Sequence, residues 1–187
     1  MKKIFIPSID ISSLTNGLNS KKSKQTIKNI KNACINIGFF QITNHGISKN
    51  QIQKICNVGI NFFKSSDQNK RRLAPKKWNK LNNNVYRGYF PSDVNGKEGL
   101  DIGDPMISSM FVKKYKRKKI EKLNLSKSLS KNSINIINKY YGEIFNLSEL
   151  LFKIIISISK KNHNLSKTAF QRVRTLSTLR FNYYPKQ

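Results

Sequence analysis

The side chains that could bind a metal ion or act as nucleophiles are few in this sequence. Its 187 residues include two histidines, His45 and His163, and two cysteines, Cys34 and Cys56. Two histidines leave little for a metal site built from imidazoles, and two cysteines exclude both a four-cysteine zinc site and a disulfide-rich scaffold. Each cysteine falls on the apolar side of an expected helix, so we interpret both as buried, unreactive thiols.

Carboxylates gather in one stretch of the chain. Four of the nine acidic residues lie close together, namely Asp93, Glu98, Asp101 and Asp104. A calcium-binding loop needs oxygen ligands at closely alternating positions, which this spacing does not provide. We interpret these carboxylates as partners of nearby basic side chains.

Basic residues dominate the charge. Lys and Arg number 36 against 9 Asp and Glu, which gives a formal net charge of +27. The densest run, Lys113–Lys119, includes one tyrosine and could neutralise phosphates and stack a base. The other lysines are spread along the chain, and no helix-turn-helix, zinc-finger or RNA-recognition signature is present. We interpret the run as a solvated loop and keep a small basic nucleic-acid-binding protein as the alternative function.

Apolar residues that recur every three or four positions predict the helices that position these groups. The longest is expected from about Asn132 to Ser159, and it should lie on a sheet or on other helices. Its expected stripe is Ile134, Ile137, Tyr141, Ile144, Ser148, Leu151, Ile155 and Ile158, widened by Phe145, Phe152 and Ile154. A helix after Ser48 is expected to bury Ile52, Ile55, Cys56, Gly59 and Phe62 or Phe63. Further helices are expected over 21–37, 65–73 and 166–173.

Runs of β-branched and aromatic residues predict the strands. Residues 3–11, interrupted by Pro7, are typical of an edge strand or an extended arm. The remaining strands are expected over 39–43, 86–90, 98–102 and 176–184, and 106–131 is expected to be irregular.

Hydrophobic residues make up 37% of the chain, which is enough to form a core. The most apolar stretch, Leu147–Ile158, carries two charged residues and is too short to span a bilayer. The start of the chain has no secretory apolar segment. We therefore expect a cytoplasmic protein without a membrane partner.

Three separated motifs together resemble one family. They are Gly38–Ile47, preceded by the arm Ile6–Asp10; Tyr86–Pro91, followed by Lys97–Gly103; and Leu179–Pro185 after the long helix. In this order and at these separations they resemble the N-terminal half of the isopenicillin N synthase-like 2-oxoglutarate- and Fe(II)-dependent oxygenases. The likeness covers nearly the whole chain.

The resemblance implies an α+β fold in which helices pack on an incomplete double-stranded β-helix, or jelly-roll, core. Residues 1–131 would form the N-terminal region of the non-haem dioxygenases, and 132–187 the long helix and first strand of the oxygenase core. It implies oxidation of a small-molecule substrate with O₂ by a complete enzyme that uses Fe(II) and 2-oxoglutarate. A separately encoded C-terminal half is a candidate partner.

The family holds iron by a His-x-Asp pair and a distant histidine, which leaves one side of the metal open for cosubstrate and oxygen. In this sequence Ile47 stands two residues after His45, and Leu165 stands two residues after His163. No Arg-x-Ser motif for 2-oxoglutarate follows the third motif either. We therefore expect a family member cut off before its iron site, with no metal ligands and no catalytic residues, that binds neither cofactor alone and is inactive alone.

The resemblance also implies binding residues. Arg87 matches an arginine that faces the substrate carboxylate, a group that a guanidinium can bind through two hydrogen bonds. Asn182 and Tyr184 match positions that contact the 2-oxoglutarate end of the pocket. The alternatives are a surface arginine and ordinary strand alternation. His45 resembles a structural turn residue.

Overall fold

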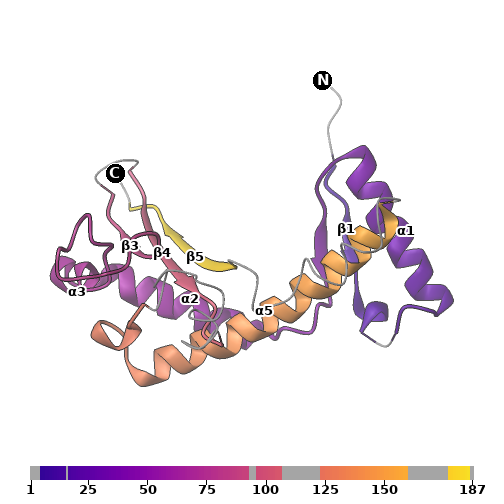
Figure 1. The fold of residues 1–187 in the computed structure, drawn as a ribbon. Helices are drawn as coiled ribbons and strands as arrows, with labels where there is room; N and C mark the ends of the chain where they lie inside the picture. Colours follow the sequence, from indigo (N-terminus) through magenta and orange to yellow (C-terminus); the bar gives the residue numbers. More distant parts are fainter. Residues whose placement is uncertain (1–4, 16, 93–95, 107–122, 160–176, 186–187) are drawn as a thin grey trace, which may run out of the picture. The chain divides into compact units, whose positions relative to one another are not determined.

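The computed structural model describes residues 5–15, 17–92, 96–106, 123–159 and 177–185, which fall into two compact units. The first unit is built from the described residues of Met1–Ser48 and Ile144–Phe170, and the second from those of Lys49–Glu143 and Gln171–Gln187. The long helix α5 (Lys131–Ile158) contributes residues to both units (Figure 1).

The first unit has a two-stranded parallel sheet and a helix. Strand β1 (Ser8–Asp10) pairs with β2 (Gln41–Thr43), and the 3-10 helix η1 (Ser12–Leu14) precedes α1 (Lys21–Asn36). The Ser20 side chain accepts a hydrogen bond from the Ser23 N–H and so caps α1. The core of this unit consists of Ile9, Ile11, Leu14, Ile30, Ala33 and Ile154.

A tight turn follows β2. Asn44 has a φ of 54° and Gly46 a φ of 85°, so both lie in the left-handed region that asparagine and glycine tolerate. The Nδ1 atom of His45 accepts a hydrogen bond from the Ile47 N–H at 3.2 Å. His45 therefore takes part in the turn itself.

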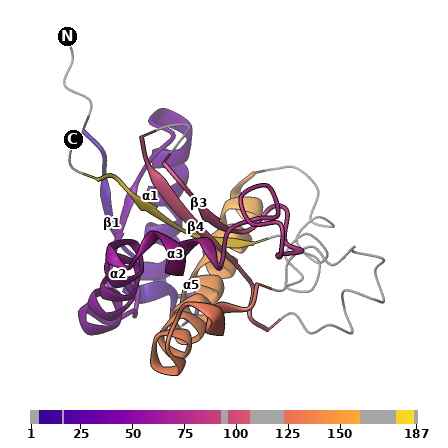
Figure 2. The same cartoon turned by 90° about the vertical axis from the view of Figure 1, so that its left-hand side faces the viewer.

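The second unit packs helices on a three-stranded antiparallel sheet. Strand β4 (Glu98–Gly103) lies between β3 (Gly88–Phe90) and β5 (Thr178–Tyr183), three strands that run side by side in both views (Figures 1 and 2). The unit also contains helices α2 (Lys49–Lys64), α3 (Asp67–Arg71) and η2 (Leu125–Lys127).

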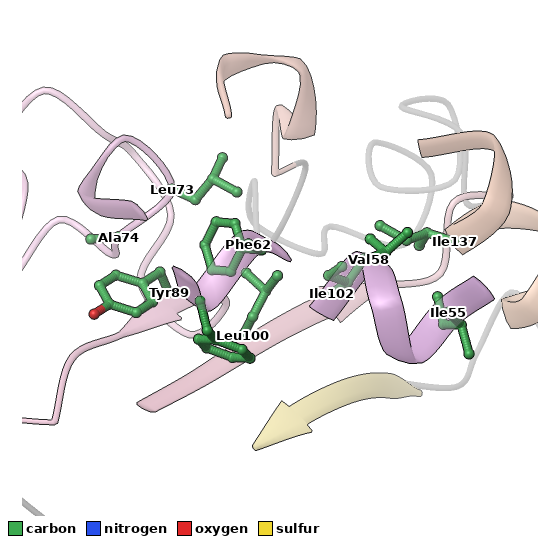
Figure 3. Close-up of a cluster of buried hydrophobic side chains, with 10 residues drawn as sticks. Ile55, Val58, Phe62, Leu73, Ala74, Tyr89, Leu100, Ile102 and Ile137 are labelled. Atoms are coloured by element: carbon green, nitrogen blue, oxygen red, sulfur yellow. The ribbon is translucent and has the colours of Figure 1, made fainter. Parts of the chain in front are cut away.

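The core of the second unit lies between the sheet and the helices. Figure 3 shows Phe62, Tyr89 and Leu100 side by side in this core. The ring centroids of Phe62 and Tyr89 are 5.8 Å apart in an edge-on arrangement, which is favourable for aromatic pairs. The buried members are Ile55, Val58, Phe62, Phe63, Leu73, Ala74, Tyr89, Leu100, Ile102 and Ile137.

Helices and strands together form the α+β architecture that the sequence predicts. The jelly-roll core and the domain boundary after residue 131 stay predictions. The expected helix over 166–173 and the basic run Lys113–Lys119 lie outside the described residues. Within the described residues, no helix combines the length and the apolar character needed to cross a membrane.

Parts of two predicted helix faces are wrong. Cys56 is exposed and Ile52 only half-buried, whereas Gln51 and Val58 of α2 are buried. The predicted face was too wide, because Cys56 lies about 160° around the helix from the buried Val58. On α5 the predicted positions Ser148 and Ile155 are exposed, whereas Phe145 and Ile154, which widen the predicted stripe, are buried as expected.

Candidate functional site

Side chains alternate between the two faces of the three-stranded sheet. Leu100 and Ile102 of β4, together with Phe181 of β5, belong to the core or pack against it. The opposite face, which we call the polar face, carries Gly99, Asp101, Gly103, Thr178, Arg180 and Asn182. Across β4 and β5, Gly99 lies opposite Asn182, Asp101 opposite Arg180, and Gly103 opposite Thr178.

Arg87 reaches the polar face at one end of β4. Arg87 is only 7% exposed. Its guanidinium occupies the space that a side chain at position 103 would fill. A Cβ atom added to Gly103 would lie 1.6 Å from the Arg87 Nη1 atom. The missing side chain at Gly103 therefore provides the room for this guanidinium.

The backbone around Arg87 is held from two sides. The Asn84 side-chain amide donates a hydrogen bond to the Arg87 carbonyl oxygen at 2.6 Å. Gly88 has a φ of 110°, and a Cβ there would lie 2.0 Å from the Leu73 carbonyl oxygen. Tyr89 donates its N–H to that same oxygen at 3.1 Å. Only glycine fits position 88, and this close approach fixes the backbone that carries Arg87.

A buried polar network anchors the inner side of the sheet. The Glu98 Oε2 atom accepts hydrogen bonds from Lys70 Nζ and from the Tyr89 hydroxyl, both at 2.7 Å. The Lys70 ammonium also lies 5.3 Å from the centre of the Tyr89 ring. Burial, and then the hydrogen bond to Glu98, raise the pKa of Tyr89, so its hydroxyl stays protonated and donates. The network ties α3, β3 and β4 together.

Arg180 and Asp101 form a two-bond ion pair on the polar face. Arg180 Nε donates to Asp101 Oδ1 at 2.6 Å, and Arg180 Nη2 donates to Asp101 Oδ2 at 2.5 Å. The Asp101 side chain is 4% exposed and that of Arg180 57% exposed. These hydrogen bonds raise the pKa of Arg180. Arg180 is not among the binding residues predicted from the sequence, although it belongs to the third motif and stands two residues before Asn182.

The other predicted binding residues lie toward the opposite end of the same face. Asn182 is exposed across from Gly99, and Tyr184, which follows β5, is 69% exposed. Gly99 and Gly103 are four residues apart on β4, about 13 Å at ~3.3 Å per residue. The structure thus places Arg87 and Asn182 on one sheet face, at its two ends.

The described residues do not fit an iron site. No three histidine, cysteine, aspartate or glutamate side chains gather closely enough among them to hold a metal ion. His45 lies in the turn of the first unit, and His163 lies outside the described residues.

Comparison with known proteins identifies the family of this chain. The family model described as the N-terminal region of the non-haem dioxygenases in morphine synthesis matches residues 6–133. Because this match covers more than half of the chain, the chain belongs to that family. The predicted resemblance to the N-terminal region of isopenicillin N synthase-like 2-oxoglutarate- and Fe(II)-dependent oxygenases is confirmed.

Individual relatives agree with this assignment. The chain is 26% identical over 191 residues to isopenicillin N synthase of Streptomyces jumonjinensis, a match that covers 99% of the chain and 56% of the relative. It is 34% identical over 101 residues to isopenicillin N synthase of Streptomyces clavuligerus, covering 54% of the chain and 30% of that relative. The chain thus spans about half the length of the relative it matches throughout.

A solved structure shows the same fold. The crystal structure of JOX2 in complex with 2OG, Fe and JA matches 97% of this chain and 48% of that protein, with a TM-score of 0.67 and 20% identity. Over the matched part, the chain therefore has the fold of that protein.

Proposed function

We propose that this chain forms the substrate-binding N-terminal part of an oxygenase that oxidises a small molecule with O₂, Fe(II) and 2-oxoglutarate. Family membership supports the reaction class. The observation that carries the proposal is the position of Arg87, a buried arginine whose guanidinium takes the place of a side chain at Gly103 on the polar face. A buried guanidinium held in one place favours the interpretation of Arg87 as a ligand-binding residue over that of a solvated surface arginine.

Arg87 is assigned to an anionic group of the substrate. A guanidinium can donate two parallel hydrogen bonds to a carboxylate, which provides orientation as well as attraction. The hydrogen bond from Asn84 and the close contact at Gly88 fix the backbone on either side, so little freedom is lost when a ligand binds.

Asn182 and Tyr184 are assigned to the 2-oxoglutarate end. Their amide and phenol groups can donate hydrogen bonds to carboxylate or keto oxygens. Both are exposed at the end of the sheet away from Arg87, so substrate and cosubstrate would lie in sequence along the polar face.

The iron ligands are assigned to a further segment of the oxygenase. The 187 residues contain no His-x-Asp pair, and the described residues contain no cluster that could replace one. We therefore propose that the chain is inactive until such a segment, on the same or on another chain, completes the site. None of the comparisons supports the nucleic-acid-binding alternative.

A chimera tests this proposal. The chain is joined to the part of JOX2 beyond the matched region, and Fe(II)-dependent conversion of 2-oxoglutarate to succinate is measured. We expect turnover by the chimera and none by the chain alone. A folded, iron-loaded chimera without turnover would overturn the proposal, as would stoichiometric, chelator-resistant Fe(II) binding by the chain alone that His45→Ala abolishes.

A further inference from the structure

A loop of the second unit presents large apolar side chains to solvent. It comprises residues 72–87, between α3 and β3, and we call it the α3–β3 loop. Leu81 is 90% exposed, Tyr86 68% and Val85 57%. Single exposed apolar residues are common on protein surfaces, but three large ones on one short loop are typical of a surface that contacts a partner.

The backbone of the α3–β3 loop is held by polar groups that point inward. Asn82 is buried, and its side-chain amide donates hydrogen bonds to the Arg72 and Ala74 carbonyl oxygens at 2.9 and 2.7 Å. The Lys76 N–H donates to the Asn84 carbonyl oxygen at 2.8 Å and so closes the loop across its width. The exposed apolar side chains are therefore held in place before any partner binds, which lowers the entropic cost of binding.

Trp78 anchors the loop to the sheet. Its ring lies edge-on to that of Phe90 of β3, with centroids 5.7 Å apart, and it packs against the core of the second unit. The Lys77 ammonium lies 4.8 Å from the centre of the Trp78 ring. Because Trp78 is half-buried, it lies at the boundary between the core and the exposed part of the loop.

The ionisable side chains of the loop are all basic. Residues 72–87 contain no aspartate or glutamate, and they include three exposed lysines, Lys76, Lys77 and Lys80. On neighbouring elements, Asp67 and Glu98 are each bonded to a basic side chain of α3. The loop therefore combines unbalanced positive charge with exposed apolar surface.

An anionic lipid surface suits both of these properties. Lysine ammonium groups are attracted to acidic headgroups, and leucine, valine and tyrosine side chains are favourable at the boundary between headgroups and acyl chains. Duplex nucleic acid would neutralise the lysines but would leave Leu81 and Val85 in water. A protein partner would need an acidic surface with an apolar hollow shaped for this loop, whereas lipids rearrange around the side chains that enter them.

We propose that the α3–β3 loop docks this protein on an anionic lipid bilayer, with Leu81, Val85 and Tyr86 in the interface and the lysines against acidic headgroups. The expectation of no membrane partner rests on the lack of a long apolar segment, which a contact with the membrane surface does not require. The proposal goes beyond the oxygenase function, because it assigns no role to the polar face.

Trp78, the only tryptophan of the chain, reports on this contact. The chain is mixed with vesicles of phosphatidylcholine alone or of phosphatidylcholine with phosphatidylserine, and co-sedimentation and Trp78 fluorescence are measured. We expect binding to the phosphatidylserine vesicles that NaCl weakens, an emission shift to shorter wavelength, and quenching by brominated acyl chains. Replacing Leu81 and Val85 by serine should weaken binding about tenfold, because less apolar surface enters the interface.

Matched controls separate the loop from the general positive charge. Ile35→Ser combined with Phe39→Ser removes two exposed apolar side chains of the first unit and should leave binding unchanged. Glutamine at the three lysines of the loop should weaken binding more than glutamine at three exposed lysines of α2 (Lys49, Lys54 and Lys64).

Three results would overturn the proposal. The first is a Trp78 emission that phosphatidylserine vesicles leave unchanged. The second is a Leu81→Ser, Val85→Ser variant that binds these vesicles as tightly as the unaltered chain. The third is a change in Trp78 emission that depends on Leu81 and Val85 but is produced by duplex DNA or by polyglutamate instead of vesicles, because the loop would then bind a nucleic acid or an acidic protein.

Discussion

Gly103 decides where the Arg87 guanidinium can lie. A methyl group at this position would come within 1.6 Å of Nη1 and 2.7 Å of Cζ, so the guanidinium would have to leave the polar face. We predict that Gly103→Ala lowers the free energy of unfolding by about 1–2 kcal/mol, within the range for overpacking, because the flexible end of an arginine can move away.

A double-mutant cycle measured by urea unfolding checks this. In the Arg87→Ala variant the guanidinium is absent, so adding Gly103→Ala should not lower the free energy of unfolding further. An equal cost in both backgrounds would show that the two residues do not compete for this space.

Asp10 provides a pH-dependent contact in the first unit. Its carboxylate accepts hydrogen bonds from the Ser12 N–H and from the Asn44 side-chain amide, both at 2.8 Å. These bonds, that to the Ser12 backbone first, lower its pKa from 3.8 to about 2. A lowered pKa favours the folded state above the unfolded pKa, and this contribution is lost as the pH falls through about 2.

We predict that an NMR titration of the Asp10 carboxyl carbon gives a midpoint well below that of an unperturbed aspartate. Asn44→Gly keeps a residue suited to the left-handed turn but removes the amide, so the midpoint should rise while staying below 3.8. A midpoint that is unchanged by this substitution would contradict the hydrogen bond from Asn44 to Asp10.

At the residue scale, the sequence predicts candidate side chains that belong to motifs. It misses contacts between side chains that are far apart in the chain. The resemblance predicted Arg87 and Asn182 as binding residues; both lie on the polar face, and their binding roles stay predictions. The pairing of Asp101 with Arg180 depends on register between residues 79 positions apart, which no local pattern reveals. The role of Gly103 likewise depends on the Arg87 side chain, which comes from the residue before β3.

The elements of the second unit are joined by one buried carboxylate. Glu98 of β4 accepts hydrogen bonds from Lys70 of α3 and Tyr89 of β3. We predict that Glu98→Gln destabilises the fold by about 3–5 kcal/mol, because it leaves the Lys70 ammonium buried without a negative partner. Chemical denaturation measures the change, and adding Lys70→Met should recover part of the loss.

The control is a more exposed pair of the same type, in which the Lys153 side chain is 54% and the Glu149 side chain 35% exposed. Glu149 and Lys153 lie one turn apart on α5, with an Oε1–Nζ distance of 2.9 Å. Glu149→Gln should cost no more than about 0.5 kcal/mol, as is usual for solvated pairs on a helix. If both Glu→Gln substitutions lowered the free energy of unfolding by similar amounts, burial would not explain the effect at Glu98.

At the element scale, the sequence predicts most helices and strands and the centre of each buried helix face, but not the margins of that face. The 3.6-residue period located α2 and α5 to within a few residues. It could not place Cys56, because apolar residues lie on both margins of the α2 stripe and only contact with the sheet selects among them. Helix α5 takes part in two separate cores, so its buried side need not follow one stripe from end to end.

The whole molecule carries far more positive than negative charge, and α1 shows how it is distributed. Lys21, Lys24, Lys28 and Lys31 recur at intervals of three and four, so they share one side of the helix, and α1 contains no acidic residue. Like charges at these spacings each cost a few tenths of a kcal/mol in helix stability. The formal net charge of +27 adds repulsion between more distant groups.

We predict that the melting temperature of the chain rises with NaCl concentration. The screening length falls from about 10 Å at 0.1 M to about 3 Å at 1 M, so repulsion between exposed lysines is removed while the buried cores are little affected. For a chain of this size, each kcal/mol gained raises the melting temperature by about 2–4 °C. Replacing the four aligned lysines of α1 by glutamine should raise the melting temperature at low salt and reduce its dependence on salt. The same number of substitutions at exposed, unaligned lysines of the second unit (Lys49, Lys54, Lys64 and Lys131) should have a smaller effect. A melting temperature that stays constant or falls with NaCl, in samples shown by light scattering to be free of aggregates, would mean that repulsion does not limit the stability of this protein.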